Sequence, residues 1–287
     1  MDKQPKLGII GGTGVYQFEA LSQVREQFVT TPFGPPSSAL IHGQINNHPV
    51  VFLARHGQGH TIPPSEINYR ANIYALKAAG VNQIVSISAC GSLREDYTPG
   101  DIVIPDQLFD FSKNRKRTFF ETGLVAHVGV ADPFCTRLSQ ILFEAVSSTT
   151  TNVHYGGTFI TIEGPRFSTK AESYLFRTWG MSIVGMTTSP EAFLAREAEI
   201  CYAAFAHVTD YDVWHETEES VNVEMIIKNL HRNNQIAQAS IVKLFELNSP
   251  QDCSCSSALS GAITTGIEAI DSHQKIKLDL LVNKYLP

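Results

Sequence analysis

The sequence lacks any long hydrophobic run: no stretch approaches the ~20 apolar residues that a membrane-spanning helix needs. The first six residues are mostly polar, and the apolar segment that follows them ends within a few residues at glycines. A secretory signal peptide requires a longer apolar region. We therefore expect neither a membrane span nor secretion, and we predict a cytoplasmic location.

Positive charge is also scarce. The chain has 22 Lys and Arg residues against 28 Asp and Glu residues, which gives a formal net charge of −6 at pH 7. Proteins that bind nucleic acids or anionic membrane surfaces generally carry an excess of positive charge. One basic cluster, formed by Lys113, Arg115, Lys116 and Arg117, has no basic or aromatic continuation, and we interpret it as a solvated loop. Nucleic acid and membrane surfaces are therefore not expected partners.

Cysteine is rare and irregularly placed. The five cysteines lie at positions 90, 135, 201, 253 and 255, an odd number without framework spacing, which indicates a reducing compartment. The pair in Cys253-Ser254-Cys255 supplies too few ligands for a zinc site by itself. We expect two free surface thiols there, with a strained, redox-labile bridge as the alternative, and we predict no metal site and no bound cofactor.

The residues that are present are those of an ordinary compact protein, with 43% hydrophobic and 17% charged residues among 287. Short, near-continuously apolar segments, typical of strands buried on both faces, alternate with stretches of helical periodicity. The strand segments are 7–10, 50–54, 84–88, 101–105, 182–186 and 203–208, and the helical segments are 66–79, 136–146, 170–178, 191–200 and 218–247.

This alternation predicts an α/β fold with a mixed central β-sheet flanked by helices. No repeat, low-complexity tract or linker divides the chain. We therefore predict a single domain over residues 1–287, in which residues from about 248 to 287 form a C-terminal helical extension.

Four of the predicted strands end in residues that can bind phosphate. Gly11-Gly12-Thr13-Gly14 offers backbone N–H groups and a hydroxyl, and Arg55-His56-Gly57 offers a guanidinium and an imidazole. Hydroxyls follow the other two strands, in Ser86–Gly91 and in Met186-Thr187-Thr188. Each motif alone is compatible with an ordinary turn, but together they predict a metal-free pocket for phosphate or a phosphoryl group.

Two carboxylates, Asp210 and Asp212, come directly after the last apolar strand. Residues i and i+2 of a strand point to the same face, so both acids are expected to project together from its carboxyl end, where ligands of α/β sheets gather. Neighbouring acids in a cleft tend to titrate apart, so that one can donate a proton while the other stays charged. The alternative is a solvated Asp turn.

Two other interpretations arise from the histidines. An Arg-His-Gly triplet also opens the phosphatases that use a phosphohistidine nucleophile, although there it is expected on the first strand. His56 and His60 have the i, i+4 spacing of a helical zinc motif, but the glycines between them disfavour a helix.

Taken together, these motifs resemble those of the methylthioadenosine phosphorylases, in the trimeric class of the purine nucleoside phosphorylase superfamily. The resemblance covers almost the whole chain to about residue 245. Besides the motifs above, it runs through Thr31-Pro32-Phe33-Gly34, Asn68-Tyr69-Arg70-Ala71-Asn72, Ala89-Cys90-Gly91-Ser92-Leu93, Ile162–Ser168 and Thr209-Asp210-Tyr211-Asp212.

The resemblance implies a homotrimer that binds a nucleoside and inorganic phosphate as co-substrates. It implies that Phe167 stacks on the purine with Ser168 nearby, that Met186 lies against the ribose, and that Asp210 and Asp212 hold the base edge. The implied phosphate ligands are Thr13, Arg55, His56, Ser88, Ala89 through its backbone, and Thr187; the implied 5′ pocket consists of Val223, Ile226 and Ile227, closed by His127 of a neighbouring subunit.

Two positions bear on how far the resemblance extends. Gly185 stands where relatives commonly have Asn, which is expected to loosen the ribose side of the site. Cys253-Ser254-Cys255 resembles a C-terminal Cys-x-Cys that is disulfide-linked in some thermophilic archaeal members of the family.

The implied reaction is phosphorolysis of S-methyl-5′-thioadenosine to adenine and 5-methylthioribose 1-phosphate, with Asp210 as the acid at the purine and Asp212 accepting from its 6-amino group. A broader purine nucleoside or S-methyl-5′-thioinosine phosphorylase is the nearer alternative. A non-catalytic nucleoside-binding protein is the more distant one.

Overall fold

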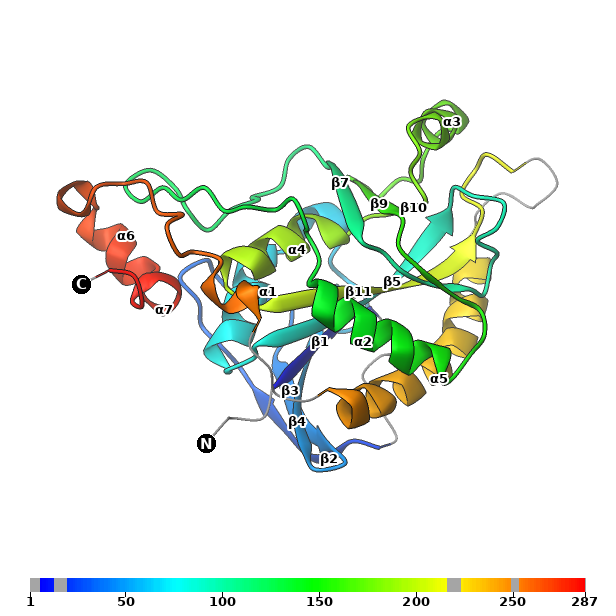
Figure 1. The fold of residues 1–287 in the computed structure, drawn as a ribbon, viewed down its shortest axis with the longest axis horizontal. Helices are drawn as coiled ribbons and strands as arrows, with labels where there is room; N and C mark the ends of the chain where they lie inside the picture. The colour runs from blue at the N-terminus through cyan, green and yellow to red at the C-terminus, as the bar shows by residue number, and fades with distance from the viewer. Residues whose placement is uncertain (1–5, 13–19, 216–222, 249–252, 287) are drawn as a thin grey trace.

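The protein is built around a mixed β-sheet that contains eleven strands in the part of the chain described here (Figure 1). The structure, a computed structural model, describes residues 6–12, 20–215, 223–248 and 253–286, and only the backbone of residues 223–233. The predicted α/β fold with a mixed central sheet is confirmed.

Four long, buried strands form the centre of the sheet. β1 (Leu7–Gly11) lies between β4 (His48–Ala54) and β5 (Gln83–Ser92), and β11 (Cys201–Asp210) follows on the other side of β5; all of these pairings are parallel. Every residue of β11 is buried, as expected for a parallel strand covered on both faces. The carboxyl ends of these strands therefore meet at one edge of the sheet.

β5 is the strand at which the sheet branches. Its last residues pair antiparallel with β10 (Ile183–Gly185), and the sheet continues from β10 to β9 (Thr158–Ile162) and β7 (Gln107–Phe111). The remaining strands are β2 (Ser22–Gln27) and β3 (Leu40–Ile45) beyond β4, and β6 (Ile102–Ile104) and β8 (Val153–Tyr155) beyond β11.

The strands that sequence reasoning missed are β2, β3, β7, β8 and β9. β2 has the sequence SQVREQ and is almost entirely exposed, and β3 contains His42, Gly43 and Gln44. Neither strand carries a continuous apolar run. Both are held by pairing with a neighbouring strand, which is information that a local hydrophobic pattern does not contain.

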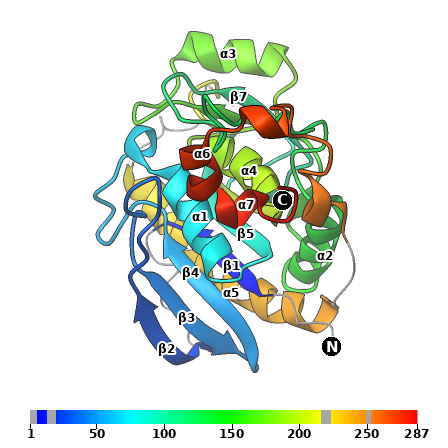
Figure 2. The ribbon, with the colours of Figure 1, turned by 90° about the vertical axis from the view of Figure 1, so that its left-hand side faces the viewer.

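Helices cover both faces of the sheet. α2 (Thr136–Ser147) and α5 (Val223–Leu247) pack together on one face, and α1 (Tyr69–Ala78) packs with α4 (Thr188–Glu197) on the other. α3 (Lys170–Thr178) projects beyond the β7–β9–β10 edge in both views (Figure 2). The predicted segment 218–247 forms one long helix from residue 223.

The C-terminal segment consists of short helices: η2 (Ser254–Ser257), η3 (Ile267–Ala269), α6 (Ser272–Lys277) and α7 (Asp279–Val282). Leu259, Leu278 and Leu281 are buried in the same cluster as α1 and α4. This segment therefore packs against the core. None of the helices that the structure describes combines the length and apolar composition that crossing a membrane requires.

Candidate active site

The predicted phosphate ligands come from neighbouring strand ends. Pairing aligns Gly11 with Ala54, the residue before Arg55, and aligns Ser88 with Ala206 on β11. Arg55, His56 and Ser88 therefore lie at the same edge of the sheet, as predicted. Thr13 lies outside the described residues.

Met186 and Thr187 reach the same edge because β10 runs antiparallel to β5. Ile183 pairs with Ser92 and Val184 with Gly91, and a Cβ at Gly185 would lie 3.5 Å from the carbonyl oxygen of Ala89, so Met186 and Thr187 follow directly after this contact. Both hydroxyls at this point are available to a ligand: the side chain of Thr187 makes no capping bond to α4, and Ser88 Oγ is buried without a hydrogen-bond partner among the described residues.

Arg55 is buried and bonded to an acid that sequence reasoning did not single out. Its Nε and Nη2 donate to the two carboxylate oxygens of Glu191 at 2.8 and 2.9 Å, and Nη2 also donates to Ser86 Oγ at 2.6 Å. The bidentate edge predicted to hold phosphate is thus occupied by Glu191. Nη1 makes only a 3.4 Å contact with the carbonyl of Ile87, so Nη1 is the nitrogen that can donate to an anion.

The Glu191 carboxylate is itself held in place. The hydroxyl of Tyr202 on β11 donates to Oε2 of Glu191 at 2.7 Å. Burial alone lowers the pKa of Arg55, but the negative charge of Glu191 outweighs it and raises this pKa above its ordinary value. Arg55 therefore remains a fixed positive charge at the end of β4. Glu191 was hard to recognise because it lies in a helix-forming stretch where an acid is normally solvated.

His56 is neutral in this environment. Burial and the positive charge of Arg55 lower its pKa to about 4. Nδ1 lies 2.9 Å from the carbonyl oxygen of Ile62, which can only accept, so Nδ1 carries the proton. Nε2 is then an acceptor, to which a protonated phosphate oxygen can donate.

Asp210 and Asp212 come together, but not by the strand geometry that we expected. β11 ends at Asp210 after an irregularity between Val208 and Asp210, and Asp212 lies in the following turn with a φ of 53°. The two acids meet instead around Gly91. A Cβ at position 91 would lie 2.8 Å from Asp210 Oδ1 and 3.1 Å from Asp212 Cβ, so only glycine allows this approach.

The environments of the two acids differ. Asp210 accepts hydrogen bonds from the backbone N–H of Asp212 at 2.8 Å and from the Thr209 hydroxyl at 2.6 Å. Burial nevertheless raises its pKa to about 6, and the charge of Asp212 adds to this rise. Burial also raises the pKa of Asp212; the hydroxyls of Ser173 and Ser168 oppose that rise, although Oδ2 of Asp212 has no hydrogen bond of regular geometry.

The segment that carries Phe167 and Ser168 passes over Met186. Gly164 has a φ of 67°, and a Cβ there would lie 2.7 Å from the sulfur of Met186. Ser168 is buried, whereas Phe167 is 38% exposed, so its ring is accessible to a ligand. The structure thus places Met186 against the start of the segment that leads to Phe167 and Ser168.

Arg115 links the segment that carries Phe167 to the residues that follow β10. The interpretation of the basic cluster as a solvated loop is therefore wrong for this residue. Arg115 is buried, and its Nη1 donates to the carbonyls of Met186 and Ser189 at 2.6 and 2.7 Å. Its Nη2 donates to the carbonyl of Glu163 at 2.6 Å. A basic run in sequence contains no signal that one member binds carbonyls in the interior.

Gly185 has a packing explanation. A Cβ at this position would lie 2.7 Å from the ring of Phe159, which occupies the space that a side chain would need. The expectation that glycine loosens the ribose side of the site stays a prediction.

The structure does not place the four residues predicted to form and close the 5′ pocket in the site. Val223, Ile226 and Ile227 lie in the first turns of α5, where only the backbone is described. His127 is exposed, and its backbone N–H donates to the carbonyl of Ala262 in the C-terminal segment. Beyond Arg115, which contacts the residues after β10, the loop that contains His127 extends toward α6 (Figures 1 and 2).

Comparison with known proteins identifies the family. The model of the phosphorylase superfamily matches residues 6–246. The chain belongs to this superfamily. Among its relatives, the S-methyl-5′-thioadenosine phosphorylase of Geobacter sulfurreducens is 48% identical over 282 residues, which cover 98% of this chain and 99% of that protein. That of Thermosynechococcus vestitus is 51% identical over 287 residues, with 98% and 99% covered.

Solved structures of phosphorylases agree with this assignment. The crystal structure of a methylthioadenosine phosphorylase sourced from an antarctic soil metagenomic library has a TM-score of 0.92 at 45% identity and covers 96% of this chain and 98% of that one. The methylthioadenosine phosphorylase of Schistosoma mansoni in complex with adenine has a TM-score of 0.83 at 35% identity, with 97% and 98% covered. The predicted family, fold and enzyme class are confirmed, and the phosphohistidine phosphatase interpretation has no support.

We predict that Glu191→Gln weakens the binding of inorganic phosphate by at least about ten-fold, because the amide cannot hold the Arg55 guanidinium as a carboxylate does. Isothermal titration calorimetry with phosphate measures the change. Glu197→Gln is the matched control, since Glu197 is also buried on α4 but accepts from the backbone of Phe119. Equal phosphate affinity in the two variants would contradict the assigned role of Glu191.

We also predict that Asp210→Asn makes stability less sensitive to pH. The pKa of Asp210 is raised from 3.8 to about 6 in the folded protein, so the stabilising contribution of its protonated form is present below the unfolded pKa and is lost as the pH rises through 6. The variant should therefore gain up to about 3 kcal/mol relative to the unmodified protein between pH 4 and pH 8. Urea unfolding at both pH values measures this; a difference that is constant with pH would contradict it.

Proposed function

We propose that this phosphorylase cleaves S-methyl-5′-thioadenosine with inorganic phosphate, giving adenine and 5-methylthioribose 1-phosphate. The observation that carries the proposal is the pair of acids around Gly91, within two strands of the buried Arg55. A proton donor for a purine and a cation for phosphate thus lie at one edge of the sheet. The substrate is inferred from the relatives named above, which are S-methyl-5′-thioadenosine phosphorylases.

In this mechanism, phosphate binds beside Arg55 at the end of β4. Nη1 of Arg55 and the hydroxyls of Ser88 and Thr187 would hold it, with His56 Nε2 accepting a hydrogen bond from a protonated phosphate oxygen. As the bond from C1′ to the purine loosens, positive charge develops on the ribose. A fixed phosphate anion stabilises that charge and then attacks C1′, which is an effect of position and electrostatics.

The purine leaves toward Asp210. Departure places negative charge on the base, and a proton delivered to N7 removes it. A carboxyl group with a pKa of about 6 retains a useful protonated fraction near neutral pH, unlike an ordinary aspartate. Asp210 is therefore the acid, and this role is typically worth ~10²- to 10⁴-fold in rate.

Asp212 determines which purine is accepted. Its buried Oδ2 makes no hydrogen bond of regular geometry among the described residues and can accept from a 6-amino group. A 6-oxopurine would place an acceptor opposite this oxygen, and an unpaired polar contact of that kind costs roughly 1–3 kcal/mol. Adenine is therefore favoured over hypoxanthine.

The test is the ratio of kcat/KM for S-methyl-5′-thioadenosine to kcat/KM for S-methyl-5′-thioinosine, measured with and without phosphate. We expect phosphate-dependent release of adenine to be the faster reaction. Asp212→Asn should lower the ratio by roughly 10- to 100-fold, since the amide can donate to a 6-oxo group. Equal rates in the unmodified protein would favour the broader purine nucleoside phosphorylase, and adenine binding without turnover would favour the non-catalytic alternative.

We further propose a homotrimer in which His127 closes the 5′ end of the site of the neighbouring subunit, beside Val223, Ile226 and Ile227. The support is that His127 is exposed on a loop that, beyond Arg115, extends toward α6. Light scattering should give three times the chain mass. His127→Ala should raise the KM for the nucleoside while leaving the KM for phosphate unchanged, whereas the control His273→Ala on α6 should change neither.

A further inference from the structure

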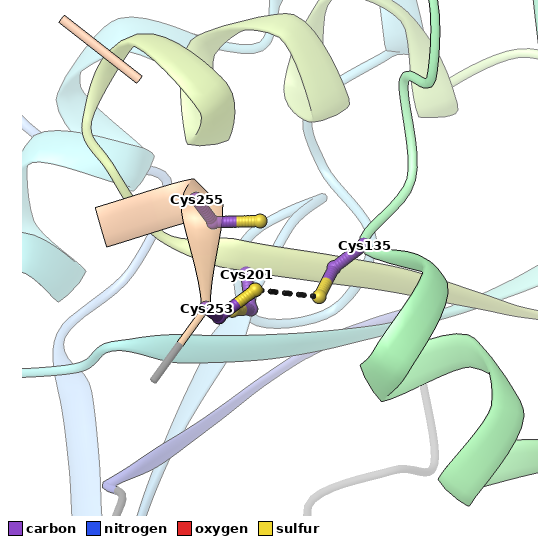
Figure 3. A group of neighbouring side chains, drawn as sticks. All are labelled: Cys135, Cys201, Cys253 and Cys255. Atoms are coloured by element: carbon purple, nitrogen blue, oxygen red, sulfur yellow. Dashed lines mark hydrogen bonds between the residues drawn. The ribbon is translucent and has the colours of Figure 1, made fainter. Parts of the chain in front are cut away.

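Four of the five cysteines converge at the end of β11 opposite to Asp210. Cys201 is the first residue of β11, Cys135 immediately precedes α2, and Cys253 and Cys255 flank the start of η2 (Figure 3). Their four sulfur atoms all lie within 4.8 Å of one another, with Cys135 and Cys253 at 3.5 Å. The expectation of two surface thiols is wrong for Cys255, which is only 3% exposed.

The cluster has the ligand chemistry of one particular class of metal site. Four thiolates arranged as a tetrahedron bind zinc at about 2.3 Å, which places the sulfur atoms about 3.8 Å apart. The sulfur atoms are already close to that separation, so binding requires movements of at most about 1 Å. Soft, all-sulfur sites select zinc or iron, whereas magnesium and calcium prefer oxygen ligands.

Two groups place positive potential beside the cluster. Cys135 occupies the N-cap position of α2, where the positive end of the helix dipole stabilises an anion. On the opposite side, Nη1 of Arg196 donates to the sulfur of Cys255 at 3.2 Å.

This positive charge is fixed relative to the cluster. Nη2 of Arg196 donates to the backbone carbonyl of Asp132, three residues before Cys135. A zinc ion with four thiolates carries a net charge of −2, and both the guanidinium and the helix terminus offset that charge. Groups outside the four ligands, namely Arg196 and the N-terminus of α2, therefore also stabilise the charge of the site.

We propose that Cys135, Cys201, Cys253 and Cys255 bind one zinc ion as a structural site. All four coordination positions are filled by protein, so the ion has no open position for a substrate. The site joins the starts of α2 and β11 to the segment that follows α5, and so fixes the C-terminal segment to the sheet. It lies nine residues along β11 from Asp210, roughly 30 Å away, which separates it from the proposed reaction.

The test is the metal content of the protein purified in a reducing buffer without added chelator. We expect one zinc per chain by inductively coupled plasma mass spectrometry, and loss of at least nine-tenths of it in the Cys253→Ser/Cys255→Ser double variant. Cys90→Ala is the matched control because Cys90 is also buried but lies outside the cluster. This variant should retain one zinc per chain.

A second measurement does not depend on any variant folding. Reduced, zinc-free protein should take up one equivalent of zinc, slow the alkylation of Cys253 by iodoacetamide at least about ten-fold, and raise its Tm by about 5 °C or more. X-ray absorption of the zinc form should show four sulfur neighbours at about 2.3 Å.

Three results would overturn the proposal. One is reduced protein that binds no zinc, whether its thiols then stay free or oxidise to disulfides. Another is iron in place of zinc, and the third is zinc that persists in the double variant. None of these readouts uses nucleoside turnover, so they are independent of the proposed reaction.

Discussion

A guanidinium buried at the carboxyl end of β4 is the constraint on which the site depends. Arg55 can be inside the protein only because Glu191 neutralises it, and Glu191 is oriented because Tyr202 and Arg55 both donate to it. Removing one partner of such a pair leaves an uncompensated charge in the interior, which costs about 3–5 kcal/mol. The pair links β4, α4 and β11, so the same contact that holds the cation also holds the elements around it.

The branching of β5 explains how the other groups reach that cation. β11 pairs in parallel along nearly the whole of β5, whereas β1 pairs in parallel with its first residues and β10 pairs antiparallel with its last residues. The parallel side contributes Arg55 and the two acids, and the antiparallel side contributes Met186 and Thr187. Gly91 lies where the two sides meet, and its missing side chain is the space into which Asp210 and Asp212 fit.

The two ends of β11 have different chemistry. At the carboxyl end, burial raises the pKa of Asp210 and makes a carboxyl group usable as an acid near neutral pH. At the amino end, a helix terminus and Arg196 surround four sulfur atoms with positive potential. The candidate active site at one end of β11 must admit substrates. The four cysteines at the other end can fill every coordination position of a metal ion.

The sequence by itself determined the central strands and most helices, because β1, β4, β5 and β11 each contain a mostly apolar run and helices such as Lys170–Thr178 have a clear period. It also predicted Arg55, His56, Ser88 and the two acids as candidate site residues, since these lie at or near strand ends that should meet at one edge. Only the tertiary structure decided which partners these residues contact. Glu191, Arg115 and the cysteine partners of Cys253 and Cys255 act through contacts between residues far apart in the chain, and no local pattern of charge or spacing encodes such contacts.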